Sequence, residues 1–298
     1  MRILITGGTG LIGRHLCPVL LKAGHDITVL SRHPASVKEK CGGAVRAFGS
    51  LDEWGAADVF DAVINLAGEP IVDARWTEKR KEVLWQSRVT LTEHLVKRME
   101  ASQYKPTVFL SGSAIGYYGN SGHKVLDESA PAASDFAAKL CDAWEQAARK
   151  AMALNIRVCL LRTGLVLDRS DGILGKMLLP FKLGLGARLG DGSQWMSWVH
   201  IDDYVAMVLV LLHNANATGP YNMTAPEPVT NRAFTAKLAR ALHRASFFVA
   251  PAWLMRLVLE ERADLVLGGQ KVMPVRITAL GYRFLHVKLE DALSDLFA

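Results

Sequence analysis

Short apolar runs alternate with helical stretches along the first two-thirds of the chain. Five of these runs are rich in Val, Ile and Leu, which is typical of strands buried on both faces. The longer stretches between them include residues 77–101 and 136–153, which have helical character. Strand alternating with helix predicts a parallel sheet with helices on both faces. The predicted strands are residues 2–6, 26–30, 62–66, 107–111 and 157–162.

The pattern changes after residue 165. Glycines become frequent between residues 172 and 192, an apolar helix is predicted over 204–212, and a short C-terminal helix is predicted over 289–297. A turn at 226–231 leads into a further helix, with Thr230 or Asn231 as its N-cap. We therefore expect an α/β protein with a Rossmann-type doubly wound parallel sheet over residues 1–165. Residues 166–298 should form a smaller, mainly substrate-binding lobe, some segments of which return to the sheet.

Composition and charge narrow the class of protein. The chain has 298 residues and a net charge of +6, but its basic residues are scattered, so no nucleic-acid partner is expected. The densest apolar run, 205–212, is far shorter than the roughly 20 residues of a membrane span. Four cysteines without paired or metal-ligand spacing indicate a reducing compartment. We expect a cytoplasmic protein with no membrane partner and no metal site.

A glycine-rich loop directly follows the first predicted strand and opens a helix. Its sequence, TGGTGLIG, covers residues 6–13. Glycines permit the tight turn, let backbone N–H groups approach a pyrophosphate, and allow the helix and strand to pack closely. In this strand–loop–helix context the motif predicts a dinucleotide site rather than a structural turn. The predicted contacts are Gly7, Thr9, Gly10, Leu11, Ile12 and Gly13.

The end of the second predicted strand indicates which dinucleotide binds. Proteins that bind NAD carry an Asp or Glu there, roughly 20 residues past the glycines, to bind the ribose 2′-hydroxyl. This chain has Ser31 and Arg32 instead. A guanidinium can bind a 2′-phosphate through two hydrogen bonds, and a serine hydroxyl can add a third. The pattern favours NADP(H) over NAD(H), the alternative being a solvated arginine at a strand end.

These motifs resemble the extended short-chain dehydrogenase/reductase superfamily. The stretches NLAGEP (65–70), SGSAIGYYG (111–119) and GILGKMLLPFKLG (172–184) are similar to its atypical branch, the bacterial "epimerase family". Proteins of this branch are NAD-dependent epimerase/dehydratase-like and nucleoside-diphosphate-sugar epimerase-like. The segment HIDD (200–203) matches as well, and we expect it to anchor a loop and cap the next helix. The resemblance covers nearly the whole chain and specifies no substrate.

The resemblance implies further cofactor contacts. Leu66, Ala67 and Gly68 would line the nicotinamide-ribose side at the end of a strand. Arg88 matches a helix position that reaches back to the cofactor in relatives, the alternative being a charge on the helix surface. The segment that usually touches the carboxamide corresponds to Gly164 and Leu165.

The resemblance also implies hydride transfer assisted by a Tyr, a Lys four residues later, and a Ser on the preceding strand. Ser113 matches the serine, but the Tyr–Lys pair is missing. Setting the Glu that usually follows the Lys on Glu145 puts Cys141 at the Lys position and Ala137 at the Tyr position. A register set on Lys139 does not restore the pair either.

Three explanations for the missing pair remain open. Tyr118 could supply the proton, although a packing aromatic is the alternative role, and Asp135, Lys139 and Lys176 are weaker candidates. The substrate itself could supply the acid–base help. Alternatively, the protein binds NADP(H) without turnover, as a redox-responsive regulator. We predict an NADP(H)-dependent oxidoreductase or epimerase-like enzyme acting on a small molecule, with Ser113 and Tyr118 as catalytic candidates.

Overall fold

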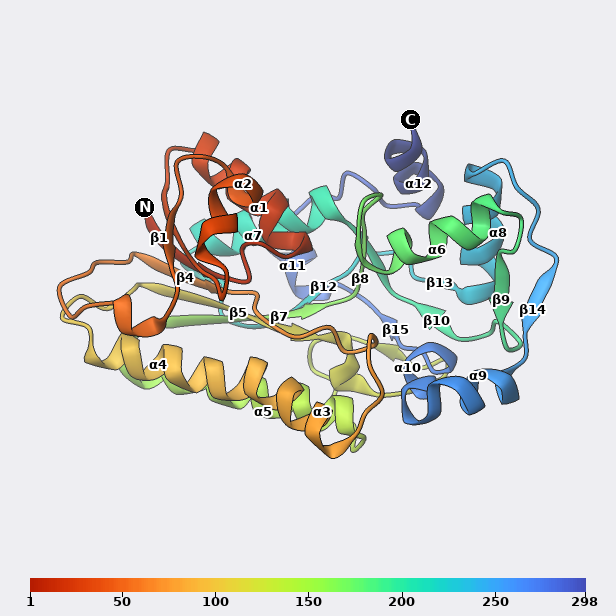
Figure 1. Cartoon of the computed structure of the whole chain (residues 1–298), viewed down its shortest axis with the longest axis horizontal. Helices are drawn as coiled ribbons and strands as arrows, with labels where there is room; N and C mark the ends of the chain where they lie inside the picture. The colour runs from red at the N-terminus through yellow and green to blue at the C-terminus, as the bar shows by residue number, and fades with distance from the viewer.

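A seven-stranded parallel sheet forms the centre of the N-terminal lobe in the computed structural model, which describes residues 1–298 (Figure 1). The strands follow the order β12-β7-β5-β4-β1-β2-β3, and each neighbouring pair is parallel. The strand order reverses between β1 and β4, as in Rossmann folds. The predicted doubly wound α/β sheet is thus confirmed. The strands are β1 Arg2–Thr6, β2 Asp26–Leu30, β3 Arg46–Phe48, β4 Ala62–Asn65, β5 Val108–Ala114, β7 Arg157–Thr163 and β12 Gly219–Met223.

Helices bury both faces of this sheet. In β1, Ile3 and Ile5 belong to one apolar cluster and Leu4 to another. Because successive side chains of a strand point to opposite faces, a strand covered on both sides is apolar at consecutive positions. One face carries α1 Leu11–Lys22, α2 Val37–Cys41 and α7 Ile201–His213, and the other carries α4 Leu91–Ala101 and α5 Phe136–Arg149 (Figure 1).

The predicted helix over 77–101 contains an irregular segment. The helix begins as α3 Glu78–Trp85. It passes through the irregular segment, a π-helical turn at Gln86–Thr90, and continues as α4. The Thr77 side chain caps its start by accepting a hydrogen bond from the Arg80 N–H at 3.2 Å. Turns of this kind are frequent at functional sites, and this one borders the cavity described below.

Two edge strands were not predicted. The strand β3 has only three residues. The strand β12 has the sequence GPYNM, which begins with Gly219 and Pro220 and includes the polar Asn222. Neither has the apolar pattern of a central strand, and both are held by pairing with a neighbour, β2 and β7 respectively. The second half of the chain thus contributes both β12 and α7 to the Rossmann layers.

The remaining elements form a smaller C-terminal lobe around its own apolar cluster, which includes Leu174, Trp198, Phe234 and Leu293. Thr230 caps α8 by accepting from the Ala233 N–H at 3.3 Å, so Thr230 is the cap and Asn231 the first helical residue. The helices of this lobe are α6 Gly172–Lys182, α8 Asn231–Ala241, α9 Ala252–Leu259, α10 Ala263–Leu267 and α12 Leu289–Phe297. The remaining short helix, α11 Val275–Ala279, is an exception, because it packs against β12 and its Ile277 belongs to the apolar cluster of the sheet. The short strands are β6 Val125–Leu126, β8 Leu165–Leu167, β9 Ala187–Leu189, β10 Trp195–Met196, β11 Trp198–His200, β13 Val229–Thr230, β14 Phe248–Ala250 and β15 Lys271–Val272.

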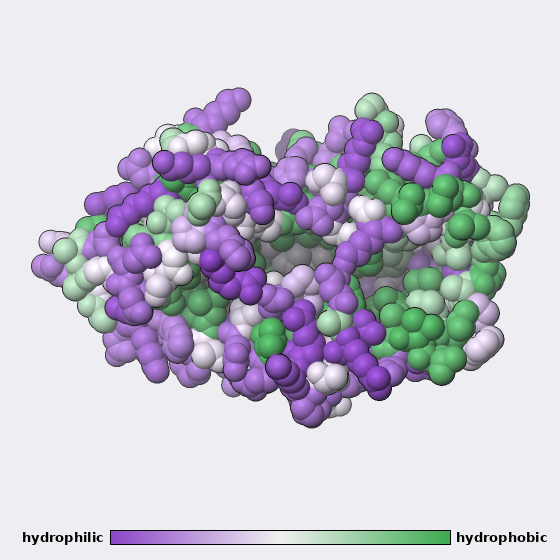
Figure 2. Space-filling model, in the orientation of Figure 1, coloured by the Kyte–Doolittle hydropathy of each residue, from purple (hydrophilic) through white to green (hydrophobic).

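Figure 2 shows the surface hollowed between the two lobes and apolar side chains gathered over the C-terminal lobe. No helix combines the length and the apolar character that a membrane crossing requires. The exposed apolar side chains of this lobe include Leu179, Leu183, Phe247, Phe248, Trp253, Leu257 and Val258.

Candidate functional site

A tight glycine turn joins β1 to α1 at the carboxyl edge of the sheet. Gly7 has a φ of +71°, and a Cβ on it would lie 2.6 Å from the Leu66 carbonyl carbon. A Cβ on Gly13 would lie 2.4 Å from the Gly8 Cα. Gly10 precedes α1 without a side-chain cap, which leaves the first N–H groups of the helix available to a ligand. The turn therefore forms a backbone cradle that fits a pyrophosphate.

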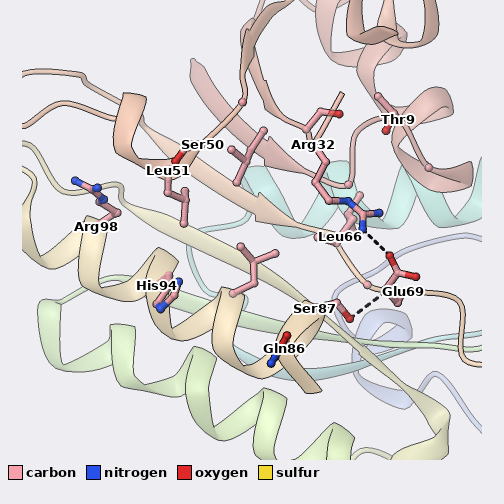
Figure 3. A pocket seen from close by; sticks show the side chains of 18 of the residues that line it. Thr9, Arg32, Ser50, Leu51, Leu66, Glu69, Gln86, Ser87, His94 and Arg98 are labelled. Atoms are coloured by element: carbon pink, nitrogen blue, oxygen red, sulfur yellow. Dashed lines mark hydrogen bonds and ion pairs between the residues drawn. The ribbon is translucent and has the colours of Figure 1, made fainter. Parts of the chain in front are cut away.

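A cavity of about 1040 Å³ opens beside this turn (Figure 3). Its wall comes from the glycine turn, the ends of β2 and β4, the segment after β3, and the α3–α4 helix. This position, where the strand order reverses, is the ligand site of open α/β sheets. The predicted cofactor residues that line the cavity are Gly7, Thr9, Gly10, Ser31, Arg32, Leu66, Ala67 and Gly68.

Arg32 lies at the rim of this cavity, where β2 ends. Its side chain is 83% exposed, and its Nη1 donates to the Glu69 carboxylate at 2.7 Å (Figure 3). The Arg80 guanidinium reaches the other oxygen of Glu69 at 3.3 Å. Hydrogen bonds from Arg32 and then Arg80 hold the pKa of Glu69 below its usual range. Arg32 is therefore placed to meet an anion, with Glu69 as its internal partner.

Part of the cavity wall was missed by the sequence reasoning. Ser50 follows β3, which was not predicted, while His94 and Arg98 lie on the helix across the cavity from Arg32 (Figure 3). The four-residue spacing of His94 and Arg98 within a predicted helix is the signal that could have placed them on one face. Arg98 forms an ion pair with Asp52. The other unpredicted polar lining residues include Gln86 and Lys97.

Six predicted cofactor residues lie outside the cavity wall. The Arg88 guanidinium packs against Gly68, where a Cβ would lie 3.0 Å from it, and donates to the Glu69 carbonyl at 2.8 Å. Gly164 packs so closely that a Cβ would lie 2.5 Å from the Ser197 carbonyl oxygen. These contacts give Arg88 and Gly164 packing roles, and a contact of either with the cofactor stays a prediction. The six residues are Leu11, Ile12 and Gly13 in the first turn of α1, Arg88 in the π-helical turn, and Gly164 and Leu165 after β7.

Ser113 lies inside a buried polar network rather than against the cavity. Its hydroxyl donates to Glu145 Oε1 at 2.8 Å. The same carboxylate receives two hydrogen bonds from Arg162, at 2.8 and 3.0 Å, and both charged side chains are 2% exposed. Burial opposes the charge on Arg162, but Glu145 outweighs it and raises the pKa of the guanidinium. A charged residue within the apolar strand 157–163 is the signal that could have revealed this network.

Tyr118 belongs to the same network. Its hydroxyl donates to Asn222 Oδ1 at 2.7 Å and accepts from Arg162 at 2.8 Å. The guanidinium of Arg162 also stacks over the Tyr117 ring, 3.7 Å from its centroid. Burial raises the pKa of Tyr118 to about 12, far from the neutral range that suits a general acid or base. The packing role anticipated as its alternative fits this environment, and a catalytic role for either hydroxyl stays a prediction.

In the register set on Glu145, apolar groups fill the positions of the missing pair. Ala137 and Cys141 are both buried in α5, and burial raises the pKa of the Cys141 thiol to about 12. The weaker candidates are occupied elsewhere or exposed. Asp135 caps α5 by accepting from the Ala138 N–H, Lys139 is exposed, and Lys176 forms an ion pair with Asp73. No described side chain restores a Tyr–Lys pair at these positions.

Ion pairs join the two lobes across the cleft. Lys81 of α3 contacts Glu261 at 2.8 Å, and Arg14 of α1 contacts Asp171 at 2.7 Å. His200 caps α7 by accepting from the Asp202 N–H at 3.2 Å, as expected for the HIDD segment. The C-terminal lobe is thus held beside the carboxyl edge of the sheet.

Sheet, glycine turn and cavity define a Rossmann-type α/β protein of the extended short-chain dehydrogenase/reductase class. The chain belongs to the NAD dependent epimerase/dehydratase family, whose model matches residues 3–224. Residues 250–296 match a domain of unknown function (DUF1731). Epimerase family protein MW0731 of Staphylococcus aureus strain MW2 is 38% identical over 296 residues, which cover 98% of each chain. Epimerase family protein YfhF of Bacillus subtilis strain 168 is 36% identical over 301 residues, covering 100% of this chain and 98% of YfhF.

Solved structures agree with this assignment. The crystal structure of the human epimerase family protein SDR39U1 (isoform 2), determined with NADPH, matches with a TM-score of 0.90 and 34% identity. The match covers 100% of this chain and 99% of that one. A nucleoside-diphosphate sugar epimerase from Corynebacterium glutamicum matches with a TM-score of 0.77 and 28% identity, covering 100% of this chain and 58% of that one. The resemblance to the "epimerase family" is therefore confirmed.

Proposed function

We propose that this chain is an NADP(H)-dependent oxidoreductase or epimerase-like enzyme that acts on a small molecule. One observation carries the proposal: Arg32 stands at the end of β2, on the rim of a cavity that the glycine turn also lines. No carboxylate occupies the positions around it, Ser31 and His33, where an NAD-specific site would carry one. The NADPH in the human relative supports the same cofactor for this chain.

The residues of the site suit the parts of this cofactor. Backbone N–H groups at the start of α1 would bind the pyrophosphate, and Arg32 with Ser31 would bind the 2′-phosphate. Arg32 would then exchange its hydrogen bond to Glu69 for the phosphate, while Arg80 keeps Glu69 paired. When bound, the nicotinamide supplies or accepts a hydride. The Leu66–Gly68 segment, at the carboxyl end of β4, would position the nicotinamide-ribose side.

A non-catalytic NADP(H)-binding regulator is the second candidate function. It is favoured by the buried network, because the hydroxyls of Ser113 and Tyr118 are both occupied by protein partners. In the register set on Glu145, Ala137 and Cys141 stand where the superfamily has its acid–base pair. For the enzyme, Ser113 would have to release Glu145 to meet a substrate oxygen.

Binding titrations followed by fluorescence test the cofactor. An arginine–phosphate contact of two charge-assisted hydrogen bonds contributes about 1.5–3 kcal/mol. Arg32→Ala should therefore weaken NADPH roughly 10- to 100-fold and leave NADH unchanged. Arg46→Ala is the matched control, since Arg46 is an exposed arginine on the neighbouring strand outside the cavity wall. Equal affinity of the unsubstituted protein for NADH and NADPH would refute the assignment.

A turnover assay separates the enzyme from the regulator. A panel of carbonyl compounds and nucleotide sugars is incubated with NADPH or NADP⁺, and both nucleotide oxidation state and sugar configuration are followed. Turnover that falls sharply in Ser113→Ala supports the enzyme with Ser113 in its mechanism. Turnover that is unchanged in Ser113→Ala supports the enzyme but excludes Ser113 from its mechanism. Tight NADPH binding without turnover across the panel supports the regulator.

A further inference from the structure

A cluster of two histidines and a carboxylate shares no residue with the wall of the cofactor cavity. His200 precedes α7, His286 lies in the loop before α12, and Asp295 belongs to α12. One ligand atom from each residue lies within 4.8 Å of the other two. The two imidazole rings are 3.9 Å apart between centroids. Three elements of the chain thus bring metal-binding groups close together, although the cysteine spacing predicts no metal site.

His286 is held as metal-binding histidines usually are. Its Nδ1 lies 3.3 Å from the buried Asp203 carboxylate, which also accepts from the backbone N–H of His286 at 2.9 Å and of Leu285 at 2.8 Å. A carboxylate only accepts, so in the neutral imidazole Nδ1 carries the proton and Nε2 the lone pair. This lone pair lies 4.0 Å from Asp295 Oδ2. A carboxylate that fixes a histidine tautomer in this way is a typical outer partner of a metal ligand.

His200 presents a nitrogen without a hydrogen-bond partner. The residue is 2% exposed, and its Nε2 makes no hydrogen bond. Asp295 Oδ2 is 3.3 Å from Nε2 but lies outside hydrogen-bond geometry. A buried polar atom left unsatisfied is costly and requires an explanation. A ligand between His200, His286 and Asp295 would supply the missing partner.

We propose that His200 Nε2, His286 Nε2 and the Asp295 carboxylate bind one divalent first-row transition metal, Zn²⁺ being the best match. Two imidazoles and a carboxylate suit Zn²⁺, with a water molecule in the fourth position. Nδ1 of His200 accepts from the Asp202 N–H at 3.2 Å, so metal binding at Nε2 requires the ring proton to move to Nδ1. This cap bond of α7 is then given up, and Nδ1–H can donate instead to the Asp202 carboxylate, 3.8 Å away. Asp202 and Asp295 are exposed and free to move inward. The metal would fasten the C-terminal helix α12 to the start of α7, which packs against the Rossmann sheet.

Zinc titration of the chelator-stripped full-length protein tests this site. Free Zn²⁺ is followed by competition with a chromogenic chelator, and Co²⁺ absorption reports the coordination geometry. We expect one metal per chain, and at least a tenfold loss of affinity in Asp295→Asn and in His286→Gln, since even outer-shell changes cost about tenfold or more. The control is His213→Gln. It removes a histidine from a second histidine pair outside the proposed site, His25 and His213, whose ring centroids are 5.6 Å apart.

Asp295→Asn keeps the test decisive if His286→Gln fails to fold, because the Asp295 side chain is 56% exposed. Unchanged circular dichroism and NADPH binding in this variant separate loss of the metal from unfolding. Absence of stoichiometric Zn²⁺ binding overturns the proposal. Binding that survives Asp295→Asn but is lost in His213→Gln overturns it as well, and assigns the metal to the other histidine pair.

Discussion

Replacing Glu145 with glutamine should leave the Arg162 guanidinium buried without a counter-charge. In the protein, Arg162 Nε and Nη2 donate to the two oxygens of Glu145 at 2.8 and 3.0 Å. Glutamine preserves the shape, removes the negative charge, and turns one acceptor into a donor that faces Arg162. Because both side chains are 2% exposed, water cannot replace the lost contact.

The size of the loss follows from the burial of this pair. Removing one partner of a buried ion pair costs about 3–5 kcal/mol, mostly because the other charge is left uncompensated. Arg162 keeps its hydrogen bonds to the Tyr118 hydroxyl and the Glu128 carbonyl, which places the expected loss near the lower value. At roughly 2 °C per kcal/mol for a chain of this size, the melting temperature should fall by about 6 °C.

Urea unfolding followed by tryptophan fluorescence measures the change in the free energy of unfolding. The matched control is Glu93→Gln, which breaks the surface ion pair between Glu93 and Lys150 and should cost less than about 1 kcal/mol. Adding Arg162→Met to Glu145→Gln should recover part of the loss, because the unpaired charge is then gone. A Glu145→Gln variant no less stable than Glu93→Gln would refute the reasoning.

Further predictions concern single side chains. Ser113→Ala should cost only about 1 kcal/mol in urea unfolding, because Glu145 keeps Arg162; a loss above 3 kcal/mol would contradict this. Glu69→Gln should tighten NADPH binding severalfold in the fluorescence titration, because the Glu69 carboxylate then no longer competes with the 2′-phosphate for Arg32. Weaker binding would argue against that competition. Burial raises the pKa of Glu128, so the folded protein binds a proton that the unfolded chain releases as pH rises above about 4.5. The unsubstituted protein should therefore lose stability relative to Glu128→Gln between pH 4 and pH 7. The free energy of unfolding of the variant minus that of the unsubstituted protein should rise over this range, and a fall would mean that the pKa of Glu128 is lowered. The native thiols should resist Ellman's reagent at pH 8 and react after unfolding, because all are buried: Cys17, Cys41, Cys141 and Cys159.

The sequence alone determined the five central strands of the sheet and the nucleotide turn. The bounds of β1 and β2 were predicted to the residue, because central strands buried on both faces carry an uninterrupted apolar signal. The glycine turn between Thr6 and Gly13 and the position of Arg32 could also be predicted locally. Each follows directly after a predicted strand, so no information about distant segments is needed. The family could be recognised in part for the same reason, because NLAGEP follows β4 and SGSAIGYYG covers the end of β5, whereas the third stretch forms α6.

Only the tertiary structure decided which polar groups meet. The partner of Ser113 is 32 residues away, at Glu145, and the partner of Tyr118 is 104 residues away, at Asn222. Asn222 lies in β12, an edge strand held by pairing rather than by its own pattern. Periodicity reports which face of an element is buried, but it carries no information about which distant side chain is packed against that face. Ser113 lies near the end of β5, and Tyr118 lies at the end of the turn that follows β5. Their hydrogen bonds, and the cluster formed by His200 and Asp295, were set by the packing of segments remote in the chain.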